Sequence, residues 1–188
     1  MYTTDFQLED VLITSELDTR PSRQRDILAE RNGLEQIARS MGFGREAVFQ
    51  QICQIGLELC NADSAGISVL TDPPENGFTW DALVGRFSPY LHGTAPRHNS
   101  PCGVSLDTGR TQLFSHPERI FEWMRSPGIP IVEGLVIPLY KEKRLPYGSI
   151  WVMKHEGGAP FTKLEAEIMT VLGGHVSAAL QIQGQRAS

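Results

Sequence analysis

The chain has 188 residues, of which 40% are hydrophobic, and a formal net charge of −5. This length suits one globular domain with an extension. The negative charge and the lack of a Lys/Arg cluster argue against a nucleic-acid partner, because phosphate-binding surfaces carry a basic excess. No apolar stretch approaches the ~20 residues that span a bilayer, and the polar start is unlike a signal peptide. We therefore expect a cytoplasmic protein with no membrane partner.

The first 30 residues are polar, with acidic residues placed ahead of arginines. We expect residues 1–30 to form an N-terminal arm, extended or with a short helix, ahead of a domain that spans 31–188. Apolar residues at helical spacing predict a helix over 34–41, which Gly42 ends. A second, wider apolar stripe predicts a helix over 45–61.

Four apolar runs predict two hairpins. Strands at 64–71 and 78–87 flank a turn of Asp, Pro, Asn and Gly. Strands at 135–140 and 147–154 flank a charged turn at 141–146. Because each pair is joined by a short connection, both pairs are expected to be antiparallel.

Between the hairpins lies an irregular segment, residues 88–133, which is rich in Pro and Gly. It predicts short helices at 102–108 and 118–125 and a short strand at 111–114. A connection of this length with its own small elements more often has a function than serves only to join the two hairpins.

The last helix has a marked start and a second pattern along its length. Thr162 and Glu165 have the spacing of a capping box, and Phe161 precedes the cap. A heptad-like seam follows, formed by Leu164, Ile168, Val171, His175, Ala178 and Ile182. The seam can pair with its copy in a parallel dimer or pack on the chain's own sheet. The polar His175 and the neighbouring Gly173-Gly174 weaken the coiled-coil interpretation.

The predicted order is helix, hairpin, irregular segment, hairpin, helix. An antiparallel sheet with the terminal helices on one face buries these elements simply, and the irregular segment then covers the other face and encloses a cavity. The fold class is therefore α+β.

Three stretches in this order resemble the GAF family, whose fold is related to PAS. They are Glu133–Tyr140 (EGLVIPLY), Tyr147–Val152 (YGSIWV), and Phe161-Thr162 followed by Glu165, Leu172 and Ala178. The resemblance covers roughly residues 33 to 182. It implies a sensory or regulatory domain of bacterial signal transduction that binds a small ligand, dimerises through its terminal helices and is not an enzyme.

The irregular segment resembles a narrower group. Ser100–Asp107 (SPCGVSLD) and Leu113–Arg119 (LFSHPER) are similar to a subset of bacterial GAF domains that are often joined to sensor histidine kinases. The resemblance implies a histidine kinase or another signalling protein as the output partner.

Aromatic residues are the first candidates for lining a ligand cavity, because small-molecule sites are mostly apolar. The candidates are Trp80, Phe114, Trp123 and Trp151, with Phe87 and Tyr90 beside them. For each of them, packing in the core is the alternative.

Polar candidates surround the start of the predicted helix at 102–108. Ser100 and Pro101 have helix-start chemistry, and a helix N-terminus attracts anionic or acceptor groups. With Arg97 and His98 they suggest a polar wall for a ligand's carboxylate, phosphate or carbonyl. The alternative is an ordinary capped helix with solvated basic neighbours. His116 is a further ligand-site candidate, or marks a loop-to-helix junction.

The three cysteines differ in their surroundings. Cys53 and Cys60 lie about two helical turns apart, too far for a disulfide, and are interpreted as buried structural thiols. Cys102 lies at a helix start, which lowers a thiol's pKa and suggests a redox or electrophile sensor. A small residue near a tight turn is the alternative role. The histidines and cysteines show no metal-ligand spacing, so we assign no metal site and no catalytic residue.

Other activities that the resemblance suggests fit less well. Some GAF-like proteins reduce free methionine sulfoxide with cysteines clustered at the pocket, but two of the three cysteines here belong to one helix. Phytochrome-like GAF domains attach a bilin to a cysteine followed by a residue such as His, whereas Gly103 follows Cys102. The Asn-Lys…Phe…Asp-Glu pattern of cyclic-nucleotide binders is missing. A dimerisation module with a vestigial pocket remains as an alternative, and the cofactor is unknown.

Overall fold

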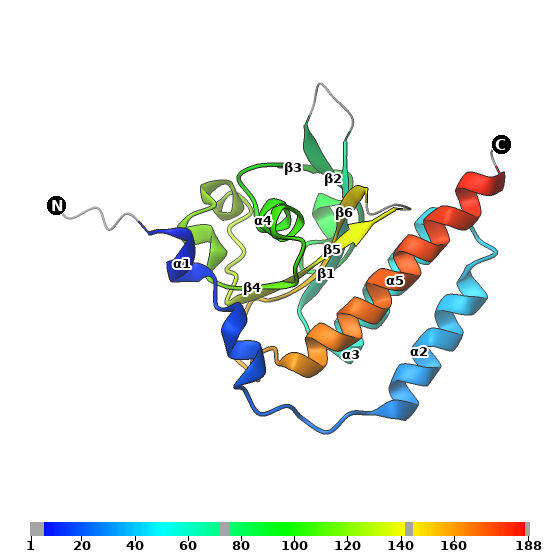
Figure 1. Ribbon diagram of the computed structural model, residues 1–188, viewed down its shortest axis with the longest axis horizontal. Helices are drawn as coiled ribbons and strands as arrows, with labels where there is room; N and C mark the ends of the chain where they lie inside the picture. Colours follow the sequence, from blue (N-terminus) through cyan, green and yellow to red (C-terminus); the bar gives the residue numbers. More distant parts are fainter. Residues whose placement is uncertain (1–5, 72–75, 142–144, 187–188) are drawn as a thin grey trace.

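A computed structural model describes residues 6–71, 76–141 and 145–186, without the side chains of 181–186. One antiparallel sheet divides the molecule into two layers. Helices α2, α3 and α5 lie on one side of the sheet, and α4 with the irregular segment lies on the other (Figure 1). This is the predicted α+β arrangement of terminal helices on one face and a covering segment on the other.

The sheet has six strands in the order β3-β2-β1-β6-β5-β4. Every neighbouring pair is antiparallel. The strands are β1 Ser64–Leu70, β2 Gly77–Gly85, β3 Thr94–Pro96, β4 Gln112–Ser115, β5 Glu133–Tyr140 and β6 Pro146–Lys154. The two predicted hairpins, β1–β2 and β5–β6, meet at the β1–β6 pair in the centre of the sheet. The tips of the two predicted turns, residues 72–75 and 142–144, lie outside the described residues.

The α-helices are α1 Leu8–Val11, α2 Ile27–Ser40, α3 Arg45–Leu59, α4 Pro101–Thr108 and α5 Lys163–Arg186. Four short 3-10 helices join them, namely η1 Thr14–Asp18, η2 Ser88–Tyr90, η3 Pro117–Arg119 and η4 Glu122–Arg125. Across the described residues, none of the helices combines the length and the apolar character needed to cross a bilayer.

Strand alternation divides the core into two clusters. On β6, Ile150 and Val152 point to the helical layer and pack with α3 and α5. Trp151 and Met153 point the opposite way, into a second apolar cluster under α4. Successive side chains of a strand face opposite sides, so every strand except β3 supplies both clusters.

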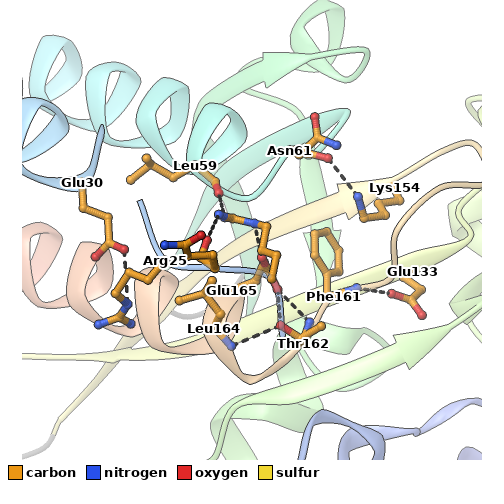
Figure 2. A network of polar contacts seen from close by, with 12 residues as sticks. Arg25, Glu30, Leu59, Asn61, Glu133, Lys154, Phe161, Thr162, Leu164 and Glu165 are labelled. Atoms are coloured by element: carbon orange, nitrogen blue, oxygen red, sulfur yellow. Dashed lines mark hydrogen bonds and ion pairs between the residues drawn. The ribbon is translucent and has the colours of Figure 1, made fainter. Parts of the chain in front are cut away.

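The predicted capping box at the start of α5 is present. The Glu165 carboxylate accepts hydrogen bonds from the backbone N–H of Thr162 (2.9 Å) and from its hydroxyl (2.6 Å), as Figure 2 shows. The Thr162 hydroxyl oxygen in turn accepts from the N–H of Leu164 (3.3 Å). The cap fixes where α5 leaves the sheet.

Two predicted helices differ from the structure. Helix α2 begins at Ile27 rather than at residue 34, because the Asp26 side chain caps it by accepting from the N–H of Ala29 (2.9 Å). The helix expected over 118–125 is divided into η3 and η4. Phe121 separates them with a non-helical backbone (φ −95°, ψ 77°) and buries its ring against Phe114, with 6.1 Å between ring centroids.

The N-terminal segment contains the short helices α1 and η1 and packs along the sheet edge. Leu12 bridges to Phe114 of β4, and the N–H of Ile13 donates to the carbonyl of Leu113 (2.9 Å). Further along, the Arg20 guanidinium reaches the buried Glu133 carboxylate (2.8 Å). The boundary at residue 30 falls inside α2 and stays a prediction.

Candidate functional site

A cavity of about 320 Å³ lies between the sheet and the irregular segment, on the face opposite the helical layer. We call it the aromatic cavity. Its large side chains are Trp80, Leu83, Phe87, Tyr90, Trp123, Met124, Trp151 and Met153, and smaller ones complete the wall, namely Thr94, Ala95, Pro101, Cys102, Ser126 and Pro127. The lining comes from β2, β3, β6, α4 and η4 and from the connections between them.

All three tryptophans of the chain line this cavity. Trp151 donates its indole N–H to the Ser68 hydroxyl (2.9 Å), and Trp123 donates its indole N–H to the carbonyl of Asn99 (2.6 Å). These bonds satisfy the polar edges of two rings. The rings of Trp80 and Trp123 lie 6.4 Å apart between centroids and are tilted by 33°.

A β-bulge explains why Trp80 reaches the cavity together with Leu83. Simple alternation places residues three apart on opposite faces. In the pairing of β1 with β2, however, Ile67 faces Ala82 and Ser68 faces Trp80, so Asp81 is the extra residue. Sequence reasoning missed Leu83 for this reason. Met153 follows Trp151 by two residues, and that spacing is the signal that would have found it.

A polar chain lies beside the cavity, behind Phe87. The two ring nitrogens of His155 lie 2.7 Å from the Ser64 hydroxyl and 2.7 Å from the carbonyl of Pro130. A neutral ring that donates from Nδ1 to Pro130 and accepts at Nε2 from Ser64 satisfies both contacts, and Ser64 then accepts from the N–H of Phe87 (3.2 Å). Burial lowers the pKa of His155, which keeps the ring neutral.

Cys102 lines the cavity at the start of α4, but it is not an activated thiol. Its thiol donates to the Ser68 hydroxyl (3.6 Å). Burial raises the pKa of Cys102 and outweighs the hydroxyls of Ser149 and Ser68, which lower it. The expectation that the helix start lowers this pKa was therefore wrong, because desolvation of the thiolate is the larger effect.

The basic candidates lie elsewhere. Arg97 and His98 line a separate hollow near β2 and the β5–β6 turn. The Arg97 guanidinium forms an ion pair with Asp107 (2.6 Å) and donates to the carbonyl of Gly103 (3.3 Å). Ser100 is buried and caps α4 by accepting from the N–H of Gly103 (3.1 Å). Arg97 and Ser100 therefore stabilise α4 and do not form a polar wall of the aromatic cavity.

Two further candidates do not line the cavity. Phe114 is fully buried in the cluster under α4, where its ring meets Phe121. His116 has a left-handed backbone (φ 48°) just before η3, and its ring lies 3.4 Å from the Glu118 carboxylate. The placement matches the loop-to-helix junction considered for it.

The other two cysteines belong to the helical layer. Cys53 and Cys60 are buried in the cluster of α3 and α5, and burial raises the pKa of both. All three thiols are free, and the sheet separates this pair from Cys102. In the part of the chain that the structure describes, no three His, Cys, Asp or Glu side chains come together as a metal ion requires.

An antiparallel sheet with helices on one face and a small, aromatic-lined cavity on the other defines an α+β domain of the kind that commonly holds small ligands. The GAF domain family model matches residues 44–181, so the chain belongs to the GAF domain family. Members of this family are sensory domains that bind small ligands in signalling proteins.

Solved structures agree on the fold. The GAF domain of a phosphoenolpyruvate-protein phosphotransferase from Coxiella burnetii is 14% identical, with a TM-score of 0.72 over 87% of this chain and 99% of that one. The second GAF domain of DevS from Mycobacterium smegmatis is 20% identical, with a TM-score of 0.62 over 77% and 99%.

A longer relative is the photosensory core module of a Stigmatella aurantiaca phytochrome, at 18% identity and a TM-score of 0.65. The match covers 87% of this chain and 39% of the phytochrome module, so the chain spans well under half of that relative. No curated protein matches the chain.

Proposed function

We propose that this chain is a sensory domain of bacterial signal transduction that binds a small molecule in the aromatic cavity. It dimerises through its terminal helices and passes the state of the cavity to a histidine kinase or another output partner. The observation that carries the proposal is the cavity itself. A cleft of about 320 Å³ opens between the sheet and the irregular segment, and a mostly apolar cleft with few polar groups is the usual form of a small-molecule site.

The irregular segment, residues 88–133, covers the cavity and is the part that we expect to change conformation when a ligand binds. Around the short elements β3, α4 and β4, the segment consists of the 3-10 helices η2, η3 and η4 and their connections, and the Trp123–Asn99 bond is one of the contacts that hold it over the cavity. Segments of this kind have two arrangements of similar free energy more readily than a sheet does. A ligand that binds one arrangement better shifts the population towards it.

The helical layer supports dimerisation. Ile27 and Leu28 of α2 are 74% and 58% exposed, and Val171 of α5 is 52% exposed. Leu164 and Ile168, the first residues of the heptad-like seam, pack into the chain's own core. The rest of the described seam faces outward, with Val171 and Ala178 exposed and His175 half-buried. The side chain of Ile182 lies outside the described residues.

Native mass spectrometry of protein purified from cells, beside a denatured sample, tests ligand binding. We expect an additional small mass that is lost on denaturation. A bare chain mass, with no small molecule from a broad library altering hydrogen exchange of 88–132, would refute a sensory pocket. The surviving proposal would then be the dimerisation module with a vestigial cavity.

Light scattering tests the dimer separately. We expect a dimer whose affinity falls in Val171→Glu, because a charge would be buried in the contact. Thr170→Glu, an exposed change one residue away, is the matched control. A monomeric wild-type chain at high concentration would contradict dimerisation through these helices.

The two less favoured activities face obstacles in the geometry. A methionine-sulfoxide reductase needs a nucleophilic and a resolving thiol together, and the sheet separates Cys102 from the other two. A bilin attached to Cys102 requires a thiolate, which burial disfavours. One solved relative is a phycoerythrobilin-bound GAF domain from a cyanobacterial phytochrome. We nevertheless expect colourless protein after co-expression with bilin synthesis.

A further inference from the structure

The lining of the aromatic cavity carries no formal charge. Among its described residues there is no Asp, Glu, Lys, Arg or His side chain. The indole N–H groups of Trp123 and Trp151 are already bound to Asn99 and Ser68. Few donors therefore remain to solvate a charged group inside the cavity.

The basic candidates from the sequence lie elsewhere. Arg97 is paired with Asp107 (2.6 Å) and lines the separate hollow with His98. An anion in the aromatic cavity would lose its water without gaining a cation or a set of donors, which is strongly unfavourable. The cavity chemistry thus selects against carboxylates and phosphates.

Besides the indole N–H of Trp80 and the hydroxyl of Tyr90, two small hydroxyl side chains line the cavity, and they lie at its mouth. Thr94 and Ser126 are the only threonine and serine of the lining, and both are exposed. A ligand with one neutral polar group can therefore keep it at the mouth, while its apolar part occupies the interior.

The walls are flat. Trp80 and Trp123 present two indole rings at 6.4 Å, and Phe87 meets Trp151 edge to face at 6.1 Å. Flat aromatic faces pack best against another flat ring system. The volume of about 320 Å³ lies at the small end of ligand sites and suits roughly two or three fused rings.

We infer that the aromatic cavity takes an uncharged, planar, largely apolar molecule of two or three fused rings and discriminates against anions of the same shape. This ligand class rests on the proposed sensory function. It excludes both nucleotides, which carry phosphate, and open tetrapyrroles, which carry carboxylates and exceed the cavity in size.

Tryptophan fluorescence tests the inference directly, because all three tryptophans line the cavity. Phenazine is a neutral, planar tricycle that absorbs where tryptophan emits. Phenazine-1,6-dicarboxylate has the same ring system with carboxylates at opposite corners. One carboxylate must therefore enter the cavity, whichever end of the molecule is inserted first. At neutral pH we expect saturable quenching by phenazine and at least about tenfold weaker binding of the dicarboxylate.

Variants and a competitor sharpen the test. Trp123→Ala should weaken phenazine binding by about tenfold. If this variant has a much lower melting temperature than the wild type, Trp80→Phe, which keeps an aromatic face, replaces it in the binding assay. Phe43→Ala, at a side chain that is 79% exposed and remote from the lining, should change nothing. The compact neutral ketone 2-adamantanone should displace phenazine poorly if planarity matters.

The outcomes separate the two proposals. Equal or tighter binding of the dicarboxylate would overturn the ligand class and leave the sensory function standing. Strong competition by 2-adamantanone would remove the requirement for a planar ligand. Binding of neither probe would also overturn the ligand class, and native mass spectrometry would then decide the sensory function by itself.

Discussion

The capping box of α5 makes a quantitative prediction for Glu165→Ala. Glu165 is buried, and its carboxylate accepts from both the N–H and the hydroxyl of Thr162 and from the Arg23 guanidinium (3.1 Å). Truncation leaves the two Thr162 donors without their acceptor in a largely buried site. Figure 2 shows how the acid joins the cap to the surrounding network.

The magnitude follows from these contacts. The Thr162 cap itself remains, because its hydroxyl still accepts from the N–H of Leu164, so the cost comes from the two Thr162 donors that lose their acceptor, about 2 kcal/mol. Arg23 is 44% exposed, so water replaces its lost partner at little cost. We expect about 2 kcal/mol in total, which for a domain of this size lowers the melting temperature by roughly 4–8 °C. Glu165→Gln keeps an acceptor for the Thr162 N–H and should cost about 1 kcal/mol.

Urea denaturation at fixed protein concentration measures the effect, because the stability of the proposed dimer would depend on concentration. Glu167→Ala is the matched control, since it removes an ion pair with Arg25 (2.7 Å) whose side chains are 52% and 43% exposed. Such a pair contributes less than about 1 kcal/mol. A cost for Glu165→Ala no larger than that of Glu167→Ala would refute the assignment of α5 stability to this cap.

Three further outcomes can be measured on the same protein. Because burial raises the pKa of all three thiols, an aromatic disulfide reagent should label the native protein slowly and label three thiols after unfolding; fast labelling of one native thiol would contradict the burial. Gly66→Ala places a Cβ against the Trp151 ring, so we expect a loss of about 1–3 kcal/mol in urea melts and weaker phenazine quenching. Burial lowers the pKa of His155 below its usual value of 6.5, so the unfolded chain takes up a proton first as the pH falls. Stability should therefore be complete above about pH 6.5 and decline below it, and His155→Gln should flatten that decline.

The order of elements was predictable because local signals determine it. The capping spacing of Thr162 and Glu165 placed the start of α5 to the residue. The two hairpins followed from apolar runs on either side of turn residues. Local hydrogen bonds and alternation act within a few residues of the chain, so a single sequence contains them.

The site was predictable only in part. The structure brings Trp80, Trp123, Trp151 and Cys102 together at one cavity. The three tryptophans could be proposed from the sequence because small-molecule sites are mostly lined by apolar and aromatic side chains. The role of Arg97 was not predictable, because its pairing with Asp107 depends on the turn of α4 that brings them together. Tertiary packing and a one-residue bulge determine which side chains face the cavity, and neither can be recognised from the spacing of residues in the sequence.

The central strands are the physical link between the cavity and the helical layer. Trp151 faces the cavity and is bonded to Ser68, while its neighbour Ile150 faces α5. At Gly173, α5 approaches the sheet so closely that a Cβ there would lie 3.1 Å from Leu139 and 3.4 Å from Ile150. A ligand that moves the Trp151 ring must either break its bond to Ser68 or displace β6, and a displaced β6 moves the surface on which α5 rests. We therefore expect Ser68→Ala to uncouple the two sides, so that phenazine still quenches tryptophan fluorescence but no longer changes hydrogen exchange in α5. Unchanged coupling in that variant would place the transmission in the covering segment instead.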